Sequence, residues 1–67
     1  MKLEQEARAH INAKKRQFRE ALREHTATTE QYLLDNLYAT HELENARRNL
    51  QAAVLWAEEA ADVHGIK

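Results

Sequence analysis

Residues 32–64 read YLLDNLYATHELENARRNLQAAVLWAEEAADVH, and apolar or small side chains recur through this stretch at alternating steps of four and three. This alternation keeps the recurring side chains on one face of an α-helix and is typical of a helix that packs lengthwise against another. Five of the ten members of this seam are alanines, and alanine allows two helix backbones to approach closely. The seam consists of Tyr32, Asn36, Ala39, Leu43, Ala46, Leu50, Ala53, Ala57, Ala60 and His64.

The composition of the chain predicts long helices. Its 67 residues include no proline, no cysteine and a single glycine, Gly65, which is well placed to end the last helix. A chain of this length forms one domain, residues 1–67, that is marginally stable alone. Its apolar runs are short and broken by charges, so we expect no membrane segment and a cytoplasmic protein.

The threonine-rich segment at residues 25–28 predicts a turn between two helices. Threonine is a poor helix former and a good N-cap, and Thr28 with Gln31 fits a capping box. We therefore expect an all-α, antiparallel hairpin with a helix over residues 3–24, a turn over 25–28 and a helix over 29–63. One continuous helix is the alternative, and the threonine cluster argues against it. The first predicted helix carries an apolar stripe of Leu3, Ala7, Ile11, Phe18, Ala21 and Leu22.

The unequal lengths of the predicted helices indicate a dimer. If the chain folds back at residues 25–28, the first helix reaches only to about the level of Leu50, and residues 51–63 project beyond it. That stretch is the most apolar in the chain, and an exposed patch of this kind marks an interface. A second copy that covers it would give a two-fold dimer with a four-helix bundle. The predicted oligomer interface consists of Leu43, Ala46, Leu50, Ala53, Val54, Leu55, Trp56, Ala57 and Ala60.

Charge is divided unevenly between the two predicted helices. Residues 8–23 contain six basic side chains and one acidic one, whereas residues 28–63 contain two basic and seven acidic ones. The simpler interpretation is that a basic helix packs against an acidic one and that the charges select the antiparallel partner. The alternative is a face that binds nucleic acid or another polyanion, formed by Lys15, Arg16, Arg19 and Arg23.

No combination of residues in the chain is typical of catalysis or metal binding. The four histidines are scattered, and none follows a glutamate in the Glu-x-x-His spacing of di-metal helical bundles. Serine and cysteine nucleophiles are missing, as is a glycine-rich phosphate loop. We therefore expect no metal, no cofactor and no enzymatic activity.

The stretch HELENARRNLQAAVLWA, residues 41–57, resembles the closing helix of small all-helical bacteriophage accessory proteins of early regions. Within that group it is also similar to the anti-CBASS cyclic-nucleotide sponges, although this chain lacks the aromatic and loop elements with which those proteins grip nucleotides. No binding residue is transferred from them.

The resemblance implies a small phage-type protein that acts by binding something. Together with the predicted dimer, we expect a non-enzymatic interaction or regulatory protein that binds a host protein. A nucleic-acid or nucleotide-binding module and a structural assembly subunit are the alternatives.

Overall fold

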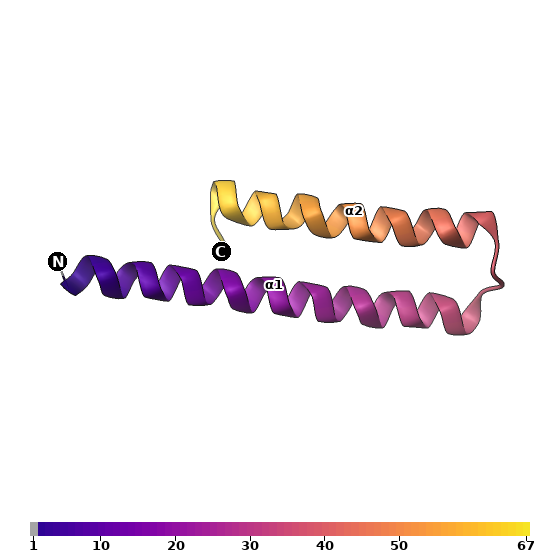
Figure 1. The fold of residues 1–67 in the computed structure, drawn as a ribbon, viewed down its shortest axis with the longest axis horizontal. Coiled ribbons are helices and arrows are strands. Elements are labelled where there is room, and N and C mark those ends of the chain that lie inside the picture. The colour runs from indigo at the N-terminus through magenta and orange to yellow at the C-terminus, as the bar shows by residue number, and fades with distance from the viewer. Residues whose placement is uncertain (1) are drawn as a thin grey trace.

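The computed structural model is an all-α hairpin of two antiparallel helices (Figure 1). It describes the backbone of residues 2–67 and the side chains of residues 8–67. Helix α1 spans Lys2–Asn36 and helix α2 spans His41–His64. The predicted helical hairpin is therefore confirmed, and Leu3 and Ala7 of the predicted apolar stripe lie outside the described side chains.

The predicted turn at residues 25–28 is wrong, because these residues lie inside α1. Three threonine hydroxyls at residues 26–29 donate hydrogen bonds of 2.8 to 3.0 Å to carbonyl oxygens one helical turn earlier. Bonded in this way, threonine is accommodated in a helix interior, so the segment continues the helix that it was expected to end. The predicted bounds 3–24 and 29–63 are wrong for the same reason. The three bonds are Thr26 to Leu22, Thr28 to Glu24 and Thr29 to His25.

The chain reverses at residues 37–40, and α2 has a cap at each end. Thr40 Oγ1 accepts a hydrogen bond of 3.2 Å from the backbone N–H of Leu43, which makes Thr40 the N-cap. At the other end, the N–H of Gly65 donates to the carbonyl of Ala61 at 3.0 Å. Gly65 has a φ of 84° and a ψ of 177°, a backbone region that essentially only glycine adopts. Gly65 thus ends α2, as predicted.

The longer helix is α1 and not α2. Helix α1 contains 35 residues and α2 contains 24, so the N-terminal end of α1 extends past the end of α2 (Figure 1). The prediction that residues 51–63 project beyond the first helix is wrong. The ion pairs Arg23–Glu58 and Lys15–Asp62, with N–O distances of 3.1 and 3.9 Å, place this stretch beside α1.

Two helices alone enclose almost no interior. Among residues 8–67, only Leu43 and Ala61 are buried. The radius of gyration is 16.1 Å, against about 11 Å for a compact chain of this length. The less exposed side chains form a single seam between the helices. On α2 the less exposed side chains are Leu43, Ala46, Arg47, Leu50, Val54, Ala57, Glu58 and Ala61, and on α1 they include Phe18, Leu22, Thr26, Glu30 and Leu33.

Candidate interaction surface

One broad face of the hairpin carries four basic and four acidic side chains. On this face Arg23 pairs with Glu58, and Arg48 lies 3.6 Å from Glu44. Successive residues of a helix are about 100° apart, which places Arg16 and Arg19 on the same side of α1 as Arg23. We call this surface the charged face. It consists of Arg16, Arg19, Arg23 and Glu30 of α1 and Glu44, Arg48, Glu58 and Asp62 of α2.

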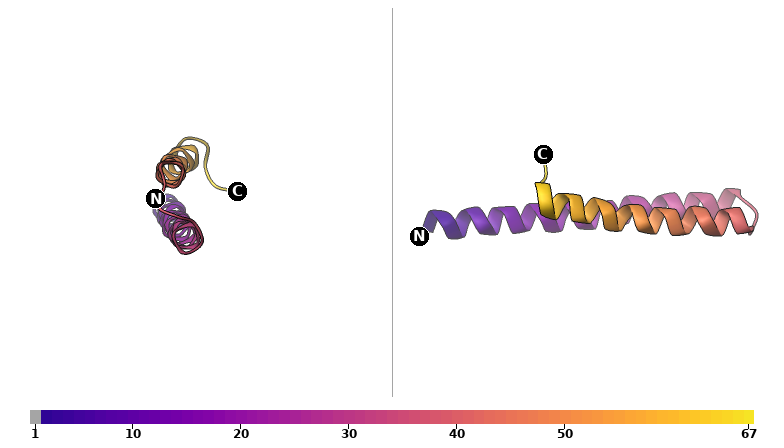
Figure 2. Two further views of the ribbon diagram at one scale, coloured as in Figure 1. Left: turned by 90° about the vertical axis from the view of Figure 1, so that its right-hand side faces the viewer. Right: turned by 90° about the horizontal axis from the view of Figure 1, so that it is seen from above.

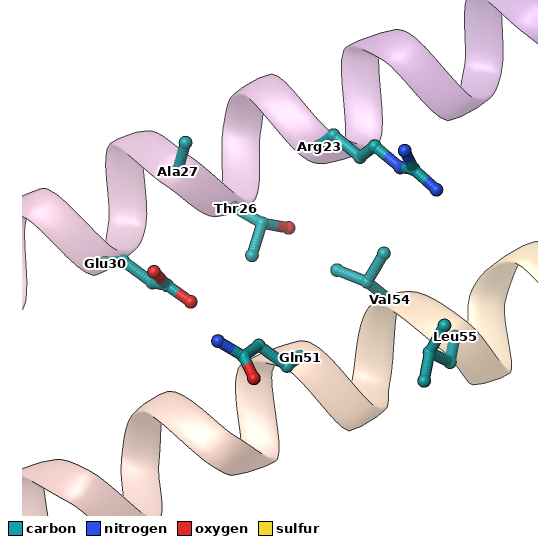
Figure 3. A pocket seen from close by; sticks show the side chains of 7 residues that line it. All are labelled: Arg23, Thr26, Ala27, Glu30, Gln51, Val54 and Leu55. Atoms are coloured by element: carbon teal, nitrogen blue, oxygen red, sulfur yellow. The ribbon is translucent and has the colours of Figure 1, made fainter.

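A shallow groove of about 310 Å³ runs between the helices on the charged face (Figure 3). Leu55 lies at its edge with 66% of its surface exposed. The groove is therefore an apolar strip with charged side chains at both ends. Its lining residues are Arg23, Thr26, Ala27, Glu30, Gln51, Val54 and Leu55.

The opposite broad face carries aromatic and small side chains. Phe18 lines a groove of about 440 Å³ there together with Ala57 and Ala60, and Trp56 lies beside Ala60. Helical spacing places Ala53 and Ala46 in line with Ala60 along α2, at steps of seven residues. We call this surface the aromatic face. It consists of Phe18, Ala21, His25 and Tyr32 of α1 and Ala46, Ala53, Trp56 and Ala60 of α2.

The largest side chains of the aromatic face are open to water. Trp56 is 72% exposed and Tyr32 is 67% exposed, and Val63, which lines the same pocket as Trp56, is 66% exposed. Exposed large apolar side chains on one face are candidates for sites of interaction. In a hairpin with so few buried side chains, this face offers apolar surface that another molecule can cover.

The structure divides the nine predicted interface residues among three environments. Leu43, Leu50, Val54 and Ala57 face α1 of the same chain. Trp56 and Ala60 line one pocket of the aromatic face, helical spacing places Ala46 and Ala53 on the same face, and Leu55 lies on the charged face. Sequence reasoning missed the contribution of α1 to the aromatic face, because the misplaced turn put Phe18 and Tyr32 on different helices.

The predicted anion-binding residues are partly neutralised by α2. The guanidinium of Arg23 and the ammonium of Lys15 pair with Glu58 and Asp62, which confirms that acidic side chains of α2 lie beside basic ones of α1. Arg16 and Arg19 are exposed, and among the described side chains neither forms an ion pair.

Arg47 occupies a position in the seam that an apolar residue would suit better. Its Nε atom is buried without a hydrogen-bond partner, and its Nη1 atom lies 3.9 Å from Glu44 Oε2. A buried donor without a partner reduces stability, so Arg47 weakens the contact between the helices.

The histidines and acidic residues do not assemble into a metal site anywhere in the described part of the chain. His41 Nε2 lies 3.4 Å from Asn45 Nδ2, and His10, His25 and His64 are exposed on other parts of the surface. Across residues that the structure describes, no helix is long and apolar enough to cross a membrane. Comparison of the chain with models of protein families, with curated proteins and with solved structures finds no match.

Proposed function

We propose that the chain is a non-enzymatic interaction protein that acts as a homodimer, in which two hairpins pack through their aromatic faces into a four-helix bundle. The observation that carries this proposal is the exposure of Trp56 and Tyr32 on one face of a hairpin that buries only two described side chains. Tryptophan and tyrosine dominate the energetics of protein interfaces.

The apolar surface of Trp56 is large enough to support association. A tryptophan offers roughly 200 Å², of which 72% is exposed here, and burial is favourable by about 25 cal/mol per Å². Covering Trp56 thus contributes on the order of 3 kcal/mol for each copy before the entropy of association is counted. Four helices packed around one core would also bury side chains that the single hairpin leaves exposed.

In this dimer the two charged faces point outward and are the surfaces available to a further protein. The resemblance of residues 41–57 to phage accessory proteins leads us to propose a host protein as that partner. The groove beside Leu55, with charged side chains at both ends, suits a surface of mixed apolar and charged character.

Nucleic-acid or nucleotide binding is the second candidate function. It is favoured by the exposed side chains of Arg16 and Arg19, which are not engaged by acidic residues in the described part of the chain. Binding to phosphates would fall steeply as salt is added.

Sedimentation equilibrium of the wild type and two variants tests the dimer. Trp56→Ala should raise the dissociation constant of the dimer at least ~100-fold, because each dimer loses two tryptophans and 1.4 kcal/mol is a factor of about ten. Leu55→Ala is the matched control, since Leu55 is similarly exposed on α2 but lies on the charged face. It should leave the dissociation constant within about threefold. A wild-type chain that is monomeric at millimolar concentration would contradict the proposal.

Binding to fluorescent DNA and RNA oligonucleotides at low salt separates the two candidate functions. If the chain is an interaction protein, as the first candidate function states, it should bind neither DNA nor RNA. Binding that disappears in the Arg16→Gln, Arg19→Gln double variant, while helicity is unchanged, would instead support the second candidate.

A further inference from the structure

Building on the proposed dimer, we infer that the occupant of the aromatic face is a second copy of this chain in antiparallel orientation. The open end of each hairpin, where α1 begins and α2 ends, then lies over the turn of the other. The inference rests on the register between the helices and on the charges at the two ends of the face.

The residues of the aromatic face lie at three evenly spaced levels along the hairpin, one central and two outer. Phe18 and Ala60 line the same groove, so they lie at one level of the antiparallel hairpin. Two helical turns, or seven residues, closer to the turn, His25 is level with Ala53. Seven residues further, Tyr32 is level with Ala46.

A two-fold axis that crosses the helices at the central level exchanges the two outer levels. It places α1 over α1 and α2 over α2 of the second copy. Phe18 of each copy, together with the C-terminal residues that line its groove, then lies over Tyr32 of the other, and Ala60 lies over Ala46. Aromatic side chains meet aromatic ones, and alanines at every seventh position allow the two α2 helices to approach closely.

The charges at the ends of the face favour the same orientation. Lys14 lies at the open end, and its ammonium donates a hydrogen bond of 3.4 Å to the carbonyl of Ile66 in the C-terminal tail. The tail leaves the plane of the helices (Figure 2). Gly65 and Ile66 line the same groove as Phe18, which places the tail on the side of the aromatic face. Helical spacing places His64 at the same end, and Asp35 and Glu42 at the end near the turn.

An antiparallel pair brings unlike charges together. The central two-fold axis places Lys14 of each copy over Asp35 of the other, and His64 over Glu42. An axis parallel to the helices would instead place α2 over α1 of the second copy, with Asp35 facing Glu42 and Lys14 facing His64. Like charges would then meet at the turn end, which selects against that orientation.

The area of the face is sufficient for a dimer. The 24 residues of α2 extend about 36 Å, and the hairpin is 19 Å wide, so the face covers on the order of 700 Å² in each copy. Standard protein interfaces bury about 800 Å² in each partner.

Single cysteines test the orientation directly, because the chain contains none of its own. In the antiparallel dimer, Ala53→Cys should form a disulfide with its own copy under mild oxidation. Ala46→Cys and Ala60→Cys should each fail to do so alone and should link to one another when mixed. Leu55→Cys, on the charged face, is the matched control and should remain unlinked.

The parallel dimer predicts a different set of links. In it, Ala53→Cys does not link to itself and instead links to His25→Cys in a mixture of the two variants. A chain that sediments as a dimer but shows this pattern, or no link at all, overturns the orientation and leaves the proposed dimer standing. A chain that sediments as a monomer overturns both.

Exchanging the charges of Lys14 and Asp35 tests the orientation of the dimer independently, with variants that remain helical and folded. Lys14→Glu and Asp35→Lys should each raise the dissociation constant of the antiparallel dimer about tenfold at low salt, since two pairs become repulsive. The double variant should return it to within about threefold of the wild type. Tighter dimers from both single variants are the result expected of the parallel orientation and would overturn the inference.

Discussion

The position of the turn leads to a prediction about two threonines. Thr40 caps α2 by accepting the hydrogen bond of 3.2 Å from the backbone N–H of Leu43. Thr40→Ala removes this acceptor and should lower the free energy of unfolding by about 1 kcal/mol. For a chain of this size, the loss corresponds to a fall in Tm of about 4–8 °C.

Thr28→Ala should have the opposite or no effect. Thr28 lies inside α1, where its hydroxyl donates a hydrogen bond of 3.0 Å to the carbonyl of Glu24 at an exposed position. Alanine is the better helix former by about 0.5 kcal/mol, and the loss of the exposed hydrogen bond offsets part of that gain. The free energy of unfolding should therefore rise by between zero and about 0.5 kcal/mol.

Thermal and urea unfolding followed by circular dichroism measures both effects. All proteins must be compared at one chain concentration, because any association raises the apparent stability. Thr29→Ala is a matched control and should behave like Thr28→Ala, since its hydroxyl also donates to a carbonyl one turn earlier, at 2.9 Å. A loss of about 1 kcal/mol in Thr28→Ala, with Thr40→Ala unaffected, would refute the reasoning and return the turn to residues 25–28.

Three further substitutions test the seam and the end of the hairpin. Arg47→Met should raise the free energy of unfolding in urea by about 1 kcal/mol, because it removes a buried Nε without a partner. The control Arg48→Met, at a position 70% exposed, should change it by less than about 0.5 kcal/mol. Equal effects would contradict the placement of Arg47 in the seam. A double-mutant cycle of Arg23→Ala and Glu58→Ala should give a coupling energy of less than about 1 kcal/mol that shrinks with added salt, because the Arg23 side chain is 64% exposed. A larger coupling energy that does not depend on salt would mean that the pair is buried. Gly65→Ala should lower the free energy of unfolding by about 1 kcal/mol, since alanine is strained at a φ of 84°; an unchanged urea midpoint would show that the end of α2 adopts another conformation.

The helical hairpin was predictable from composition and periodicity, but the position of its turn was not. Threonine is favoured both at N-caps and, with its hydroxyl bonded one turn back, in helix interiors, so Thr26, Thr28 and Thr29 are compatible with either structure. The observed turn contains Leu37, Tyr38 and Ala39, and none of these is a typical turn residue. Only Thr40 marks the start of α2, and a single threonine is a weaker signal than three.

The apolar residues of α2 were predictable, but the neighbour that each one contacts was not. Ala53 precedes Val54, and Ala60 precedes Ala61, so a seam through either member of each pair has coiled-coil spacing. At the remaining pair, Ala46 and Arg47, the sequence favours alanine, whereas the structure places the arginine in the seam between the helices. Which member of each pair faces α1 depends on how α1 packs, and the spacing of residues in α2 carries no information about that packing.

The small number of buried side chains determines how the chain responds to proteases. Because the hairpin buries only Leu43 and Ala61 among its described side chains, we expect it to open readily and its cleavage to follow the population of the open form. Any molecule that binds the closed hairpin reduces this population and lengthens the lifetime of the protein. We therefore expect the abundance of the chain to follow that of any molecule that covers its apolar surface.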